Sequence, residues 1–117
     1  TLFTANELTQ FISDFMSQYK SSIPPDIKRM GYLIRDAKYN GIAEQWEKSS
    51  ANINNLKSYW SMVKAQVKEE QEKQASQMEL SIYELEKVVN QNNLTLTLLK
   101  SDISLDNLQK LEESFEK

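Results

Sequence analysis

Two groups of carboxylates are the first side chains in this sequence that could do chemistry. Glu69, Glu70 and Glu72 form one group, and Asp102 and Asp106 form the other. A catalytic general acid needs a raised pKa, which requires a desolvated position in a cleft. Both groups instead lie in polar stretches with lysines nearby, which is typical of solvated helix faces. The sequence therefore predicts no catalytic residues and no enzyme.

Most other kinds of site are removed by composition. The 117 residues contain no Cys and no His, which excludes disulfides, Cys nucleophiles, Ser-His-Asp triads and zinc sites with Cys or His ligands. The two isolated glycines cannot form a phosphate-binding loop, and no stretch has the Asp-rich, Gly-turned pattern of a calcium loop. We predict neither a cofactor nor a metal.

Lys28, Arg29 and Arg35 are the one basic grouping of note. Exposure to solvent is the simpler interpretation, and contact with a phosphate or an acidic partner is the alternative. The net charge of −3 argues against the phosphate-neutralising surface that non-specific nucleic-acid binding needs. We expect no direct contact with nucleic acid.

The residues that break helices are confined to positions 24–41. Before them, Thr4 and Glu7 form a capping box, and apolar residues recur at helical spacing to Tyr19, which predicts a first short helix. Pro25 suits the first position of a second short helix, and Asn40-Gly41 is predicted to end it in a left-handed turn. Gly31 lies within that helix, either as tolerated slack or for the close approach of another helix.

Residues 42–91 contain neither Pro nor Gly, and they carry a heptad pattern in two parts. The step between the parts, from Val67 to Met78, is eleven residues, which indicates a stutter bridged by Gln71 and Ala75. The pattern predicts one long coiled-coil-forming helix over 42–91. No apolar run approaches the length of a membrane span, so none is expected.

The C-terminal segment, 94–117, is ambiguous at its start. Leu94, Leu96 and Leu98 alternate with polar residues as in a strand, but a lone strand has no sheet to join. Further along, Leu105, Leu108, Leu111 and Phe115 continue at helical spacing. We favour a helix or turn for residues 94–99.

These elements predict an all-α fold in which short antiparallel helices pack on the long helix, and we treat 1–117 as one helical interaction domain. A helix of 49 residues would reach ~74 Å, too long to be buried by the remaining 68 residues. Either it breaks at the polar segment and folds back or another chain covers it, and the filled heptad positions favour the second. We thus expect a homodimer or hetero-oligomer subunit with protein partners bound by helix–helix packing. The predicted interface is Phe11, Phe15, Ile27, Ile34, Trp46, Ile53, Leu56, Trp60, Val63, Val67, Met78, Ile82, Leu85 and Val89.

The segment "IPPDIKRMGYLIRDA" resembles the Leu-Pro-x-Glu-Leu-x-Arg-x-x-x-Leu-Met-Arg-Asp-Leu motif in the N-terminal domain of the inhibitor of growth (ING) family. "FISDFM" is similar to that family's first helix, and "SDISLDNLQKLEESFE" is similar to its closing motif. Pro25 and Ala37-Lys38 depart from the family pattern. The resemblance implies a coiled-coil dimerisation domain of a histone acetyltransferase or deacetylase complex, in the nucleus. The family's zinc finger needs Cys and His, so it cannot lie in these residues.

A second resemblance ranks below the first. "PPDIKRMGY" followed by "NGIAEQWEK" is similar to the Pro-Pro-x-Ile…Tyr…Gly-Leu-Val region of subunit d in the peripheral stalk of mitochondrial ATP synthase. The spacing to the glycine differs by one residue, and that family's Asp-Trp pair is missing. It implies a helical subunit of a mitochondrial assembly. Both resemblances imply an intracellular protein.

Overall fold

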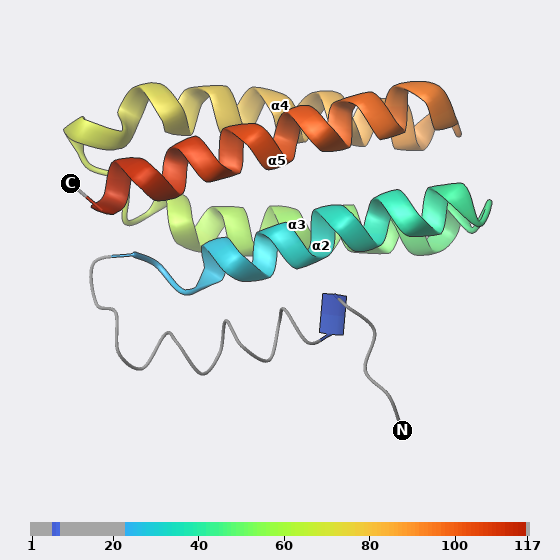
Figure 1. Ribbon diagram of the computed structural model, residues 1–117, viewed down its shortest axis with the longest axis horizontal. Coiled ribbons are helices and arrows are strands. Elements are labelled where there is room, and N and C mark those ends of the chain that lie inside the picture. The colour runs from blue at the N-terminus through green and yellow to red at the C-terminus, as the bar shows by residue number, and fades with distance from the viewer. Residues whose placement is uncertain (1–5, 8–22, 117) are drawn as a thin grey trace.

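The computed structural model describes residues 6–7 and 23–116, and the regular structure in this part of the chain is helical throughout (Figure 1). This confirms the predicted all-α class. The elements are α2 (Asp26–Ile42), α3 (Trp46–Lys64), the short 3₁₀ helix η1 (Glu69–Gln71), α4 (Glu72–Asn90) and α5 (Leu94–Glu116). Of the first predicted helix, only Asn6 and Glu7 are described, and both are helical, whereas Phe11 and Phe15 lie outside the described residues.

The four long helices form two antiparallel hairpins, α2–α3 and α4–α5, that pack against each other. Helices α2 and α5 lie at the front in Figure 1 and α3 and α4 lie behind them. Each helix contacts two neighbours, because α2 also packs on α5 and α3 on α4. The radius of gyration of 13.9 Å is close to the ~13 Å of a compact domain of this size. The described part of the chain therefore forms a four-helix bundle.

Helix α2 begins at Asp26, one residue after the predicted first position at Pro25, and ends later than expected. Pro25 is the N-cap residue, and Asp26 accepts a hydrogen bond from Arg29 Nη1 at 2.9 Å within the first turn. The predicted left-handed stop at Asn40-Gly41 is wrong, because the helix continues to Ile42 and the positive φ of 60° falls on Glu44. Gly41 is instead buried, which gives its small size a role in packing rather than in turning.

The predicted single helix over 42–91 is also wrong, because the chain turns twice within it. Residues 43–45 join α2 to α3, and a second connection separates α3 from α4. In the second, Lys68 is extended, and the Gln71 side chain accepts a hydrogen bond from the Lys68 backbone N–H at 2.9 Å. Gln71 Nε2 also donates to the Ser114 carbonyl at 3.3 Å, which ties this turn to the end of α5. The helix breaks at the polar segment and folds back, the less favoured of the two predicted outcomes.

Residues 94–99 form the start of α5 and not a strand. Asn92 adopts a positive φ of 52°, which turns the chain after α4. The Asn93 side chain then accepts a hydrogen bond from the Leu96 backbone N–H at 3.0 Å. An Asn side chain bonded to a free N–H in the first turn is a typical N-cap, so the helix start has a local cause.

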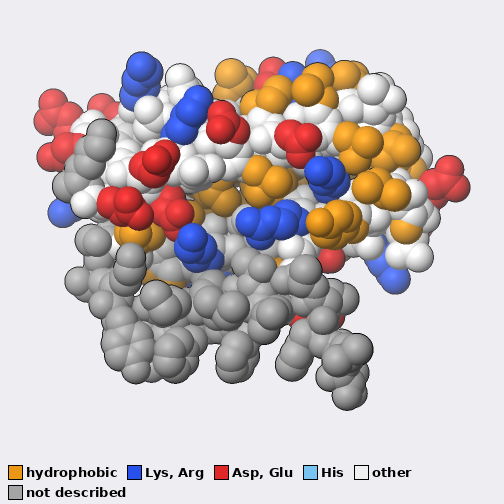
Figure 2. Space-filling view, viewed as in Figure 1, with side chains coloured by type: hydrophobic (Ala, Val, Ile, Leu, Met, Phe, Trp, Pro, Cys, Tyr) orange, Lys and Arg blue, Asp and Glu red, His pale blue; other side chains and the backbone are white. Residues whose placement is uncertain are grey.

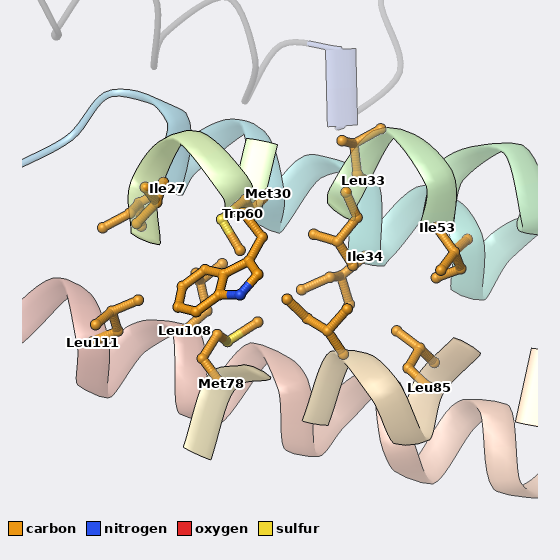
Figure 3. Close-up of a cluster of buried hydrophobic side chains, with 14 of the residues drawn as sticks. Ile27, Met30, Leu33, Ile34, Ile53, Trp60, Met78, Leu85, Leu108 and Leu111 are labelled. Carbon is orange, nitrogen blue, oxygen red and sulfur yellow. The ribbon is translucent and has the colours of Figure 1, made fainter. Parts of the chain in front are cut away.

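The core lies between the two hairpins, and all four long helices contribute to it (Figure 3). Ile53, Leu56, Trp60 and Val63 of α3 are buried at the spacing that the heptad pattern predicts, although the helix is not continuous. Each fully buried aliphatic side chain contributes about 1.5–3 kcal/mol relative to an exposed one. The same periodicity on α4 buries Met78, Ile82, Leu85 and Val89. Among the described helices, none has the length and hydropathy that a membrane crossing would require.

Candidate interaction surface

The predicted interface residues lie mainly inside the bundle. Ten of them are buried in the core of the single chain: Ile27, Ile34, Ile53, Leu56, Trp60, Val63, Met78, Ile82, Leu85 and Val89. Trp46 and Val67 are partly buried against the same core. A partner would reach these side chains only by opening the bundle. A candidate interaction surface must therefore be sought on the outside of the helices.

The carboxylates do not come together in a cleft. Glu69, Glu70 and Glu72 are exposed at the start of α4, whereas Asp102 contacts Lys38 Nζ at 3.0 Å and Asp106 contacts Lys110 at 3.1 Å. Within residues 6–7 and 23–116, no group of three or more acidic side chains is placed to bind a metal ion. This arrangement fits the interpretation of the carboxylates as solvated helix faces.

Glu79 and Tyr32 have displaced pKa values, and each displacement has a structural cause. The pKa of Glu79 is lowered by hydrogen bonds from Lys64 and from the Trp60 indole, at 2.6 Å and 3.2 Å. A lowered pKa is the opposite of what a general acid requires. The pKa of Tyr32 is raised by burial and then by the charges of Asp36 and Glu7. Both shifts follow from packing of the bundle, and neither marks a reaction site.

The first half of α5 has small polar residues inside and large aliphatic residues outside. Thr97, Ser101 and Ser104 are all 0% exposed, and the Ser104 hydroxyl donates to the Ser81 carbonyl of α4 at 3.4 Å. Thr97 Oγ1 and Ser101 Oγ are buried without a hydrogen-bond partner among the described residues. The small inner residues allow close packing, since a Cβ on Gly41 would lie only 3.6 Å from Thr97 Cγ2.

The outer surface of this half carries Leu96, Leu99 and Ile103, at spacings of three and four residues that place them on one side of the helix. These three residues, which we call the α5 apolar face, are 36–52% exposed. Figure 2 shows hydrophobic side chains gathered over the end of α5 near the α4–α5 turn, whereas charged side chains predominate at the other end. These residues are not among the predicted interface residues, although their spacing is a signal that the sequence contains.

The neighbouring helices extend the exposed apolar area. Tyr39 and Ile42, at the end of α2, are 54% and 51% exposed, and the 3.6 Å between Thr97 Cγ2 and the point that a Cβ on Gly41 would occupy places this end of α2 beside the start of α5. Leu80 of α4 is also exposed, one residue before the Ser81 that bonds Ser104. Contiguous exposed apolar area of this kind commonly marks a binding surface.

A groove of about 560 Å³ lies between α2 and the second half of α5. Ile27, Gly31, Leu105 and Leu108 line its apolar part. Its polar lining is provided by Lys28, Arg35, Asp106, Gln109 and Glu112.

The basic grouping noted in the sequence is divided by the structure. Lys28 Nζ contacts both carboxylate oxygens of Glu112, at 2.9 Å and 3.2 Å, and Arg29 is bonded to Asp26. Arg35 lies further along α2, where its Nη1 is buried and has no acceptor within the described part of the chain. The three cations therefore do not form one basic patch, and Arg35 alone leaves a guanidinium nitrogen in the groove without an acceptor.

No family model, curated protein or solved structure matches this chain.

Proposed function

We propose that this chain is a non-catalytic helical module that binds a protein partner through the α5 apolar face. The observation that carries the proposal is the polarity of the first half of α5, with Thr97, Ser101 and Ser104 inside and Leu96, Leu99 and Ile103 outside. Folding of the single chain leaves 36–52% of these three aliphatic side chains exposed. A partner that covers them completely gains the remaining part of their burial energy, about 0.5–1.5 kcal/mol for each side chain.

The shape of the surface favours a helix as the partner element. Leu96, Leu99 and Ile103 follow the three-and-four spacing by which amphipathic helices pack on one another. The charged groups nearest to them are already paired within the chain, as Lys100 is with Glu84 at 3.5 Å and Lys38 is with Asp102. A partner can thus cover the α5 apolar face without leaving a buried charge unpaired. A second copy of the chain and a different subunit both satisfy this requirement.

The experiment compares the wild-type chain with a Leu99→Lys/Ile103→Lys variant. Solution mass is measured by analytical ultracentrifugation, and partners are captured by cross-linking. The control is Met62→Lys, which makes the same kind of substitution once, at an exposed apolar position of α3. We expect the double variant to lose self-association or the captured partner, while the control keeps it.

All three positions are substantially exposed, so we expect the variants to remain folded. Circular dichroism checks this expectation. A wild-type chain that is monomeric and captures the same proteins as the double variant would contradict the proposal. Loss of binding in the Met62 control as well would show that the effect is not specific to α5.

The narrower proposal is that the module is a scaffold or dimerisation subunit of a histone acetyltransferase or deacetylase complex. It is supported by the ING-like motifs, which lie on α2 and at the end of the chain on α5, two helices in direct contact. The alternative is a mitochondrial peripheral-stalk subunit. A Cys/His-rich zinc finger downstream in the full gene product supports the first, and a mitochondrial presequence upstream supports the second.

A further inference from the structure

The groove between α2 and α5 contains a guanidinium group with an unused donor. Arg35 folds back over Gly31, so that its Nη1 and Nη2 lie 3.5 Å and 3.6 Å from the point that a Cβ on Gly31 would occupy. Nη1 is shielded from solvent and has no hydrogen-bond partner in the described part of the chain. A charged donor that is shielded from water and has no acceptor carries an uncompensated free-energy cost of desolvation. An acceptor that enters the groove beside Gly31 removes that cost.

The other charged side chains of the groove each have an ion-pair partner. Lys28 Nζ lies 2.9 Å from Glu112 Oε2, although this buried oxygen accepts no hydrogen bond within the described part of the chain, and Asp106 contacts Lys110 on the outside of α5 at 3.1 Å. The groove side chain that has a charge and no ion-pair partner among the described residues is therefore Arg35. A carboxylate fits it best, because its two oxygens match the planar guanidinium fork.

Apolar walls lie next to this donor. Ile27 comes from α2, and Leu105 and Leu108 come from the facing side of α5. A ligand that fills the groove must place an aliphatic group against these leucines while it presents its carboxylate to Arg35. The chemistry of the lining thus requires an acidic group and an apolar group a short distance apart.

The shape of the groove indicates which kind of molecule carries the acidic group and the apolar group. Its volume of about 560 Å³ lies within the range of small-molecule sites, but such sites enclose most of the ligand surface. This groove is only partly enclosed, which suits side chains that are held on a peptide backbone. We propose that the α2–α5 groove binds an acidic peptide segment of a partner protein, with a Glu or Asp carboxylate on Arg35 and a neighbouring aliphatic side chain against Leu105 and Leu108.

The test is an NMR titration of the ¹⁵N-labelled chain with the peptide acetyl-Ser-Leu-Glu-Leu-Ser-amide. Its matched control is the same peptide with Gln in place of Glu. We expect the Glu peptide to move the Gly31 amide and Arg35 Nε–H resonances in a saturable way. The Gln peptide should bind at least about tenfold more weakly, because it lacks the charge that strengthens the hydrogen bond.

Three variants of the chain make the test specific. Arg35→Gln should weaken binding of the Glu peptide by at least about tenfold. Arg29→Gln, the same change on the same helix but outside the groove lining, should alter it by less than about twofold. Asp106→Asn should strengthen binding of the Glu peptide by about twofold, because it removes a negative charge that repels the carboxylate of the peptide. Asp106 is exposed, so this variant keeps the test valid even if Arg35→Gln does not fold.

Equal binding of the two peptides, unchanged binding by Arg35→Gln, weaker binding by Asp106→Asn or no shift at about 10 mM peptide would overturn the proposal. Saturable shifts of the same resonances by hexanoate at lower concentrations than the peptide would assign the groove to a free carboxylic acid and also overturn it. The Leu99→Lys/Ile103→Lys variant should bind the peptide normally. Failure of the α5 apolar face is therefore distinguishable from failure of the groove.

Discussion

The two halves of α5 pack against the same bundle by different means. The second half buries Leu108, Leu111 and Phe115. The first half buries Thr97, Ser101 and Ser104 and leaves its large aliphatic residues exposed. The second half thus contributes to folding chiefly through the hydrophobic effect, whereas the first contributes by allowing close packing of the helices.

Helix α2 mirrors this difference, because each of its glycines faces one half of α5. A Cβ on Gly31 would lie 3.5 Å from Leu108, whereas Gly41 is opposite Thr97 and against the Trp46 ring. The contrast shows that burial of a helix need not follow its most apolar side. Where a helix leaves its apolar side outside, stability and binding are assigned to different residues and can be tested separately.

The largest expected effect comes from truncating one leucine in each half. Leu111 is 0% exposed, so Leu111→Ala should lower the free energy of unfolding by about 2–5 kcal/mol, the usual cost of a cavity in a packed core. Leu99→Ala, the same change on the exposed side of the first half, should alter it by less than about 0.5 kcal/mol. Urea unfolding followed by circular dichroism measures both. A large loss from Leu99→Ala would mean that the α5 apolar face is covered within the chain.

The buried hydroxyl groups of the first half should produce an effect of opposite sign. Thr97→Val keeps the shape of the side chain and removes a hydroxyl that has no hydrogen-bond partner among the described residues, so stability should rise by about 1–2 kcal/mol. Thr95→Val is the matched control at an exposed position of the same helix, and it should be nearly neutral. Destabilisation by Thr97→Val would show that the hydroxyl group has a partner in solution.

The two glycines of α2 provide the next comparison. Gly31→Ala should stabilise the chain by up to about 1 kcal/mol, because alanine favours the helix and its Cβ would make only ordinary contacts. Gly41→Ala should destabilise the chain, because its Cβ would lie 3.2 Å from the Trp46 ring. We expect the cost of this overpacking to exceed the gain in helix propensity. Thermal unfolding of the two variants gives the sign directly. Equal stabilisation would mean that Trp46 moves aside and that the first half of α5 is not closely packed.

Much of the fold could be predicted from the sequence because periodicity is a local property. The spacing of Ile53, Leu56 and Trp60 identifies the inner side of α3 whether or not the helix continues. The break before α4 could not be predicted in the same way, because it depends on Gln71, whose side chain contacts Ser114, 43 residues away. A turn that is stabilised by a distant part of the chain need not contain Pro or Gly, and residues 65–71 contain neither.

The candidate surface was harder to predict than the fold. Apolar residues occur on more than one side of α5, so the heptad pattern alone does not decide which side is buried. In the structure Thr97 is buried opposite Gly41 of another helix, while Leu96 and Leu99 lie outside, and this pairing of distant residues is not visible in the sequence. Lys28 and Arg35 were recognised as a basic group, but the sequence contains no sign that Glu112 would neutralise only the first of them.

The smallest expected effect separates the ion pairs that join α2 to the two halves of α5. Lys28–Glu112 lies at the second half, where the Glu112 side chain is 17% exposed, and Lys38–Asp102 lies at the first half, where Asp102 is 63% exposed. Lys28→Met should cost several tenths of a kcal/mol, because it leaves a partly buried carboxylate unpaired, and Lys38→Met should be close to neutral. Since both pairs are screened by salt, unfolding at low and high ionic strength provides the check. A larger salt dependence for the Lys38 pair would mean that the first half of α5 relies on charge more than its close packing implies.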